Sequence, residues 1–179
     1  MRIAICGPDG SGKTEIAKYI SSKYNYQIVE DYYRLMTIDL GYQTFFEVSN
    51  KWKLINNILD KLGSFINEKN NLVFDRSAID IWVIWQRWCW GKFSPEKSIN
   101  ILEKVKMIMS SYESVVILPI NPNPIYDGFR YINKHYAIQY YMLIKGFIAN
   151  FPNICIYNVI KEQLDLDGIK EKVDLFLKI

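Results

Sequence analysis

A glycine-rich segment near the start of the chain, GPDGSGKT at residues 7–14, constrains the fold more than any other feature of the sequence. It matches the pattern G-x-x-x-x-G-K-[S/T], and it lies between a short apolar run and a segment whose apolar residues have helical spacing. Glycines let the backbone curl so that successive N–H groups converge on an anion, and the amino end of a helix adds partial positive charge. The segment therefore predicts a phosphate-binding turn between a buried strand and a helix.

The positions of this loop have distinct expected roles. Lys13 is expected to reach the outer phosphates of a nucleotide as a point charge, and the Thr14 hydroxyl is expected to bind Mg²⁺. We therefore predict ATP and Mg²⁺ as the cofactors. The residues assigned to nucleotide binding are Gly7, Asp9, Gly10, Ser11, Gly12, Lys13 and Thr14.

Charge and hydropathy exclude several classes of protein. The net charge of the 179-residue chain is only +3 and is spread along the sequence, which gives no case for a nucleic-acid partner. No apolar run approaches the roughly 18 residues of a membrane span, so no membrane partner is expected. The amino terminus reads as a strand and lacks the pattern of a secretion signal, which predicts a cytoplasmic protein.

The cysteines and the histidine argue against a zinc hydrolase. Cys6, Cys89 and Cys155 are odd in number, lack metal-ligand spacing and lie in apolar runs, so we expect buried free thiols. His135 is the single histidine of the chain and cannot build a zinc site alone.

Short apolar runs alternate with segments of helical periodicity along the chain. The runs are apolar on both faces, which is typical of a parallel sheet covered by helices. We predict one domain over residues 1–179, an α/β three-layer sandwich of the P-loop NTPase type with a five-stranded parallel sheet. Strands are expected at residues 3–6, 26–29, 72–74, 115–120 and 153–157, and helices at 14–24, 45–66, 78–90, from 94 onward, 131–150 and 165–177.

The residues after the third strand favour phosphate transfer over a switch or a motor. A signalling GTPase would need Asn-Lys-x-Asp, and the nearest string, NKHY at residues 133–136, lacks the aspartate. A motor ATPase usually ends this strand in Asp-Glu, whereas Asp75 is followed here by Arg76. An arginine there is poorly suited to activate water but well suited to hold a second, anionic or hydroxylic substrate.

Three features together resemble the P-loop nucleoside and nucleotide kinases: GPDGSGKT, the acidic end of the second strand (Glu30-Asp31), and Asp75-Arg76-Ser77. Asp-Arg-Ser is a hybrid of the Asp-Arg-aromatic motif of thymidylate kinases and the Glu-Arg-Ser motif of deoxyribonucleoside kinases. The chain is also similar to ribosylnicotinamide-kinase-like P-loop proteins, which have an acidic-aromatic-Arg segment after strand two.

The resemblance implies roles for these residues. Asp75 would hold Mg²⁺, although an aspartate here is also a good N-cap for the next helix. Arg76 would bind the phosphate or 5′-hydroxyl of the acceptor; the alternative is a surface ion pair with Asp80. The acid after strand two would take the proton of an acceptor hydroxyl, and the sequence does not decide between Glu30 and Asp31. Arg34 would be a further anion contact.

A lid is expected at about residues 121–135, after the fourth strand. Kinases of this fold carry a mobile, arginine-bearing lid at this point, and cations there neutralise charge on the transferred group. We assign Arg130 as the lid arginine, with Lys134 one helical turn later. The alternative is a basic helix start on the surface.

The helix predicted at residues 78–90 is unusually rich in tryptophan. Core packing of a buried helix would explain it, and so would a wall that stacks on a base. In the second interpretation Trp82 grips the base, Gln86 bonds its edge and Trp52 faces it across the pocket. Asp80 would be polar lining or surface.

We therefore expect an ATP- and Mg²⁺-dependent phosphotransferase acting on a small nucleotide or nucleoside. The Asp-Arg pattern favours a nucleoside monophosphate acceptor of the thymidylate-kinase type, while Glu30-Asp31 favours a deoxyribonucleoside or nicotinamide riboside. The alternative outside enzymes is a nucleotide-binding regulator. The sequence does not decide between a monomer and a homodimer, since aromatic helices suit both a dimer face and a core.

Overall fold

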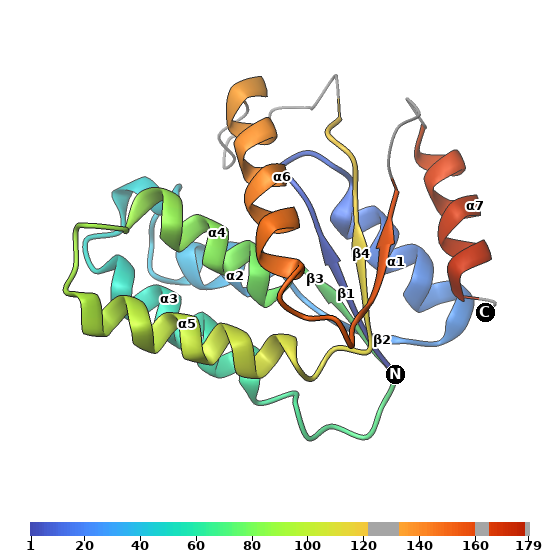
Figure 1. Cartoon of the computed structure of the whole chain (residues 1–179), viewed down its shortest axis with the longest axis horizontal. Helices are drawn as coiled ribbons and strands as arrows, with labels where there is room; N and C mark the ends of the chain where they lie inside the picture. Colours follow the sequence, from blue (N-terminus) through green and yellow to red (C-terminus); the bar gives the residue numbers. More distant parts are fainter. Residues whose placement is uncertain (122–132, 160–164, 178–179) are drawn as a thin grey trace.

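The computed structural model describes residues 1–121, 133–159 and 165–177 (Figure 1). Strands and helices alternate along these residues, as the sequence predicts. The strands are β1 (Arg2–Cys6), β2 (Gln27–Val29), β3 (Leu72–Asp75), β4 (Ser114–Ile117) and β5 (Cys155–Asn158). The helices are α1 (Lys13–Tyr24), α2 (Tyr32–Asp39), the 3-10 helix η1 (Phe45–Glu47), α3 (Lys51–Gly63), α4 (Ala78–Trp88), α5 (Pro95–Met109), α6 (Lys134–Ile148) and α7 (Leu166–Leu177).

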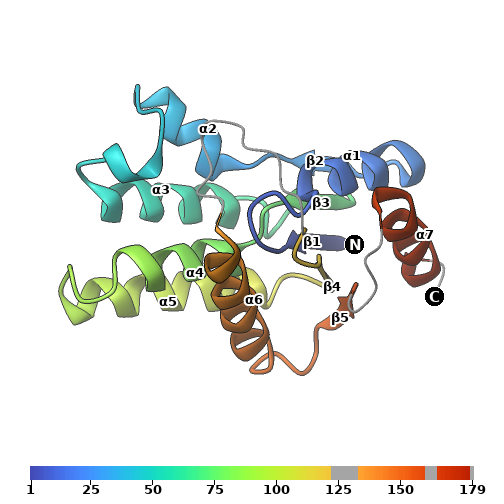
Figure 2. The same cartoon turned by 90° about the horizontal axis from the view of Figure 1, so that it is seen from above.

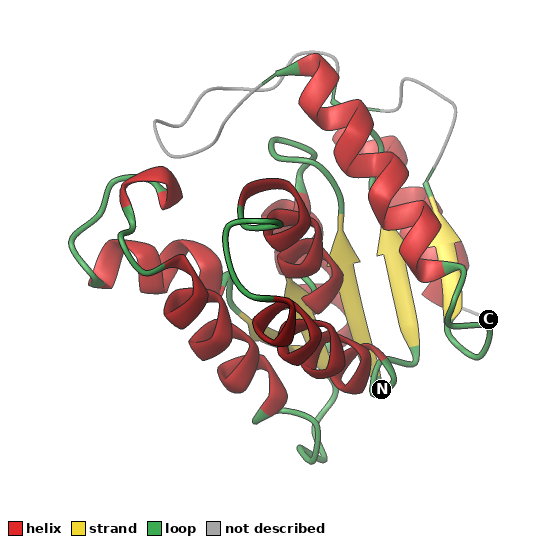
Figure 3. Cartoon of the chain, turned by 60° about the vertical axis from the view of Figure 1, so that its left-hand side comes forward, coloured by secondary structure: helices red, strands yellow, loops and turns green. Residues whose placement is uncertain are grey.

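The five strands form one parallel sheet in the order β2-β3-β1-β4-β5. The strand arrows in Figure 3 point the same way. The central strand β1 pairs with both neighbours, and Ala4 lies opposite Phe74 on one side and Val115 on the other. All carboxyl ends therefore meet at one edge. That edge carries the glycine loop after β1 and the acidic segments after β2 and β3, which is where ligands bind in open α/β sheets.

Helices cover both faces of the sheet (Figure 2). Side chains of β1 alternate: Ile3 and Ile5 pack in a core with α1 and α7, while Ala4 and Cys6 pack in a larger core with α3 to α6. Both faces of a parallel strand are thus buried, which explains the unbroken apolar runs in the sequence. The predicted three-layer α/β/α sandwich is confirmed.

The segment between β2 and β3 differs from the prediction of a single helix at residues 45–66. A helix, α2, begins directly after Asp31, whose side chain accepts from the Arg34 amide. The 3-10 turn η1 follows, and α3 begins only after Asn50, whose side chain accepts from the Lys53 amide. The caps at Asp31 and Asn50 divide the segment, because each satisfies free N–H groups of a new helix.

Some boundaries and one cysteine also differ from expectation. The strand predicted at 115–120 ends at Ile117, and β5 starts at Cys155 rather than residue 153. Cys155 is exposed on this edge strand, so its predicted burial is wrong, whereas Cys6 and Cys89 are buried. Among the helices that the structure describes, none is long and apolar enough to cross a membrane.

Candidate active site

The glycine loop between β1 and α1 has the backbone that only glycine adopts easily. Gly7 has φ +151°, and a Cβ placed there would lie 2.9 Å from Ser11 Oγ and 3.2 Å from Leu118 O. Gly12 is the N-cap of α1 in the left-handed region, with φ +89°. The loop therefore turns tightly onto the amino end of α1, as the motif predicts.

Lys13 lies across the loop. Its side chain is buried, and Nζ donates to Gly7 O at 2.7 Å and to Pro8 O at 2.9 Å. The Ser11 hydroxyl is buried and has no hydrogen-bond partner in the described part of the chain. A buried ammonium and an unsatisfied buried hydroxyl beside a helix amino end fit the phosphates of a nucleotide.

Thr14 and Asp75 meet at the start of α1 and the end of β3. Burial raises the pKa of Asp75, and a hydrogen bond with the Thr14 side chain acts in the opposite direction. A hydroxyl and a carboxylate are oxygen ligands of the kind that Mg²⁺ prefers. The described residues hold no cluster of three metal-ligating side chains, so Mg²⁺ here would take its other ligands from phosphates and water. Asp75 does not cap α4; the cap is Ser77.

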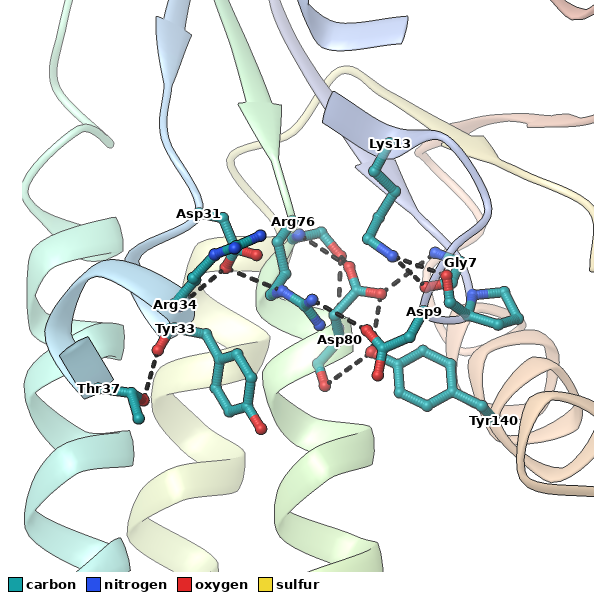
Figure 4. A network of polar contacts seen from close by, with 12 residues as sticks. Gly7, Asp9, Lys13, Asp31, Tyr33, Arg34, Thr37, Arg76, Asp80 and Tyr140 are labelled. Atoms are coloured by element: carbon teal, nitrogen blue, oxygen red, sulfur yellow. Dashed lines mark hydrogen bonds and ion pairs between the residues drawn. The ribbon is translucent and has the colours of Figure 1, made fainter. Parts of the chain in front are cut away.

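Arg76 is the most constrained residue of the site (Figure 4). Its backbone has φ +92°, rare for a non-glycine residue, and its side chain is only 2% exposed. The guanidinium bridges two carboxylates, with Nε donating to Asp31 Oδ1 at 2.9 Å and Nη2 to Asp9 Oδ1 at 3.1 Å. It also lies 4.9 Å from the centroid of the Tyr33 ring. The alternative of a surface ion pair between Arg76 and Asp80 is wrong.

The two acids after β2 are in different environments. Asp31 is partly buried, holds Arg76 and caps α2, whereas Glu30 is exposed. Both acids line a cavity of about 220 Å³ together with Thr14 and Asp75. Its lining residues include Thr14, Glu30, Asp31, Arg34 and Asp75. The structure thus brings together residues that lie far apart in the sequence.

Asp80 lies in neither of its expected places. It is fully buried, and its carboxylate accepts from the amides of Gly7 and Ser77 and from the hydroxyls of Ser77 and Tyr140. With both oxygens occupied, this side chain is not at the surface and has no capacity left for a substrate.

The tryptophans do not form one wall. The Trp82 ring packs against Trp90 and Phe147, with centroids 6.4 and 5.8 Å apart, and belongs to the core below α4. Trp52 lies under Lys97 of α5, whose Nζ is 4.9 Å from the ring centroid. Trp82 lines a cavity of about 630 Å³ to which Trp52 does not contribute. The expected opposition of Trp82 and Trp52 across one pocket is therefore not seen among the described residues. Gln86 is half-buried on α4.

Two further outcomes concern the lid and a residue that the sequence did not single out. Arg130 and most of the segment 121–135 lie outside the described residues, so the lid stays a prediction. Asn121 is described, and its side-chain amide donates to Gly10 O at 3.0 Å. Tyr33 was not assigned a role, although it lies in the acidic-aromatic-Arg segment after strand two, because that segment does not say that its ring packs against Arg76.

This fold and this loop define the class of P-loop NTPases. A family model described as "AAA domain" matches residues 2–163, and the chain belongs to that family. None of the curated proteins compared with the chain matches its sequence.

Solved structures similar to this fold include a deoxyadenosine kinase and a thymidylate kinase. Deoxyadenosine kinase from M. mycoides with bound dCTP has a TM-score of 0.68 and 16% identity, with 99% of each chain covered. The NadR protein in complex with NR has a TM-score of 0.74 and 14% identity, covering 99% of this chain and 52% of that one. Thymidylate kinase from Candida albicans has a TM-score of 0.66 and 15% identity, covering 99% and 90%. At these identities the similarity is one of fold.

Proposed function

We propose that this protein is an ATP- and Mg²⁺-dependent phosphotransferase whose acceptor is a hydroxyl group of a nucleoside. The observation that carries the proposal is the bridge from Asp9 through Arg76 to Asp31. It ties the phosphate-binding loop to the acid after β2, so that the donor side and the acceptor side share one arginine.

The charges of this bridge favour a hydroxyl acceptor over the monophosphate that the Asp-Arg pattern favours. One guanidinium faces two carboxylates, and Asp75 adds a third close by. A phosphate that bound Arg76 would have to compete with Asp9 and Asp31 for its guanidinium, whereas a neutral hydroxyl would not displace either carboxylate. A hydroxyl also needs a base, and Asp31 provides one.

Each residue then has a defined task. The loop amides and Lys13 hold the phosphates of ATP, which supplies the transferred γ-phosphoryl group. Thr14 and Asp75 would hold Mg²⁺, whose charge neutralises the phosphates. Asp31 takes the proton of the acceptor hydroxyl. The hydroxyl oxygen bonds to the γ-phosphorus as the bond between the γ-phosphorus and the leaving ADP oxygen breaks. Arg76 Nη1, which is buried and has no hydrogen-bond partner among the described residues, is the donor left for the acceptor oxygen.

A substrate panel tests this function. Purified protein, ATP and Mg²⁺ are incubated with deoxyribonucleosides, ribonucleosides, nicotinamide riboside and nucleoside monophosphates, and ADP release and phosphorylated product are measured. Product from nucleosides but not from monophosphates supports the proposal. Product from monophosphates alone refutes the hydroxyl acceptor, and MgATP binding without any product supports a nucleotide-binding regulator instead.

A matched pair of variants distinguishes the two acids. Asp31→Asn keeps a side chain that can cap α2 but removes the base, so kcat is expected to fall by roughly 10²- to 10⁴-fold. Glu30→Gln changes an exposed neighbour and is expected to alter kcat less than about fivefold. Steady-state kinetics with the best nucleoside make the comparison. A larger loss in Glu30→Gln would assign the base to Glu30.

A further inference from the structure

Asp80 has more hydrogen-bond donors than a helix cap requires. Its Oδ2 accepts from the Ser77 amide at 2.8 Å and the Ser77 hydroxyl at 2.7 Å, which completes the capping box of α4. Its Oδ1 accepts from the Gly7 amide at 3.2 Å and from the Tyr140 hydroxyl at 3.0 Å. The second oxygen therefore does something that capping does not explain.

The donors to Asp80 come from three separate segments that meet at the site (Figure 4). Gly7 opens the phosphate-binding loop, Ser77 follows the strained turn at Arg76, and Tyr140 is on α6, the helix after residues 122–132. Burying a carboxylate is costly unless its oxygens are fully bonded. Because four donors are needed, the carboxylate is stable here only when all three segments are in place together.

Resting on the function proposed above, we propose that Asp80 is a positioning residue that fixes the phosphate-binding loop, the Arg76 turn and α6 relative to one another. The Gly7 amide fixes the start of the loop that holds the donor. The Ser77 bonds hold the turn that keeps Arg76 at φ +92° between Asp9 and Asp31. A group that aligns donor and acceptor raises kcat without contacting either one.

Asp80→Asn tests the proposal at almost constant size. An asparagine has one oxygen and one NH₂, so either the Gly7 amide or the Ser77 amide must face another donor. Hydrogen exchange is measured in the peptides that contain Gly7, Ser77 and α6. We expect faster exchange in all three, with β4 unchanged. Faster exchange only at the start of α4, or equally in every peptide, would reduce Asp80 to a cap or a general stabiliser and overturn the proposal.

Kinetics give the second measurement. Misplacement of this kind is expected to lower kcat by roughly 10²-fold in Asp80→Asn, while KM for the nucleoside changes less than about threefold. The control Val173→Ala truncates a fully buried core residue on α7 and is expected to lower the melting temperature without this loss of kcat. An unchanged kcat in a folded Asp80→Asn protein would contradict the proposal.

Variants that each remove a single donor to Asp80 keep the test decisive if Asp80→Asn does not fold. Tyr140→Phe and Ser77→Ala each remove one hydroxyl donor, and each is expected to lower kcat about tenfold and to speed exchange in its own segment. Wild-type kinetics and exchange in both would overturn the inference. If the wild-type protein phosphorylates nothing in the panel, the proposed function fails. The exchange measurements still decide whether Asp80 fixes the three segments relative to one another.

Discussion

Asp75 is a carboxylate that the fold buries beside the amino end of α1, and burial raises its pKa above the ordinary value of 3.8. A raised pKa means that the folded chain binds the proton more tightly than the unfolded chain. The stabilising effect of protonated Asp75 is complete below 3.8 and is lost as the pH rises through the folded pKa. At neutral pH without metal, ionised Asp75 therefore destabilises the fold.

Asp75→Asn is expected to be more stable than wild type at pH 7 without Mg²⁺, because the variant removes a buried charge. A gain of ~1 kcal/mol would raise Tm by about 2–4 °C, and the gain should shrink as the pH falls toward 3.8. Thermal melts from pH 7 to pH 4 measure it, with the exposed Asp39→Asn as control. MgATP should raise Tm of wild type more than that of Asp75→Asn. A gain that grows on acidification would contradict this account.

At the scale of elements, one carboxylate joins α7 to α1, the helix that begins in the phosphate-binding loop. Asp174 accepts from the hydroxyls of Tyr19 and Tyr24, each at 2.7 Å, and from Lys23. Burial alone would raise the pKa of Asp174, but these hydrogen bonds lower it to about 2. Since the folded pKa is lowered, the stabilisation is present above 3.8 and is lost as the pH falls toward 2.

Asp174→Asn is expected to lower Tm at pH 7 by about 2–4 °C, the effect of ~1 kcal/mol after solvent screening of a partly exposed group. The difference from wild type should be small near pH 2. Asp167→Asn is the matched control on α7, because its pair with Lys170 is 83% exposed on the aspartate side and should contribute little. Equal effects of the two variants would show that Asp174 is an ordinary surface charge.

At the scale of the whole molecule, local sequence patterns predicted the strands and helices better than they predicted which side chains from different elements contact one another. Apolar runs and the glycine loop suffice for the parallel sheet, because both faces of each strand are buried. The bridge of Arg76 to Asp9 and Asp31 could not be read from the sequence, since spacing does not say which carboxylate faces a guanidinium. Asp80 was misplaced for the same reason: its partners are brought near by the fold.

The rates at which the three cysteines react with a thiol reagent test whether the fold opens as one unit. Cys6 and Cys89 are buried, burial raises the pKa of both and that of Cys89 to about 11, and Cys155 is exposed. A thiol reagent should therefore modify one cysteine quickly in the folded chain and two only when the chain opens. Cys155→Ser should abolish the fast phase and leave the slow one.

The slow phase should depend on the nucleotide, because a ligand that binds only the folded chain reduces the population of open chains. At MgATP concentrations 100 times Kd, the rate of modification of Cys6 and Cys89 is expected to fall about 100-fold where opening is global. Lys13→Ala, which removes the cation of the phosphate-binding loop, should show little of this protection. A slow phase that MgATP leaves unchanged would mean that these thiols react through local openings, and that the two helical layers are not held as one cooperative unit with the loop.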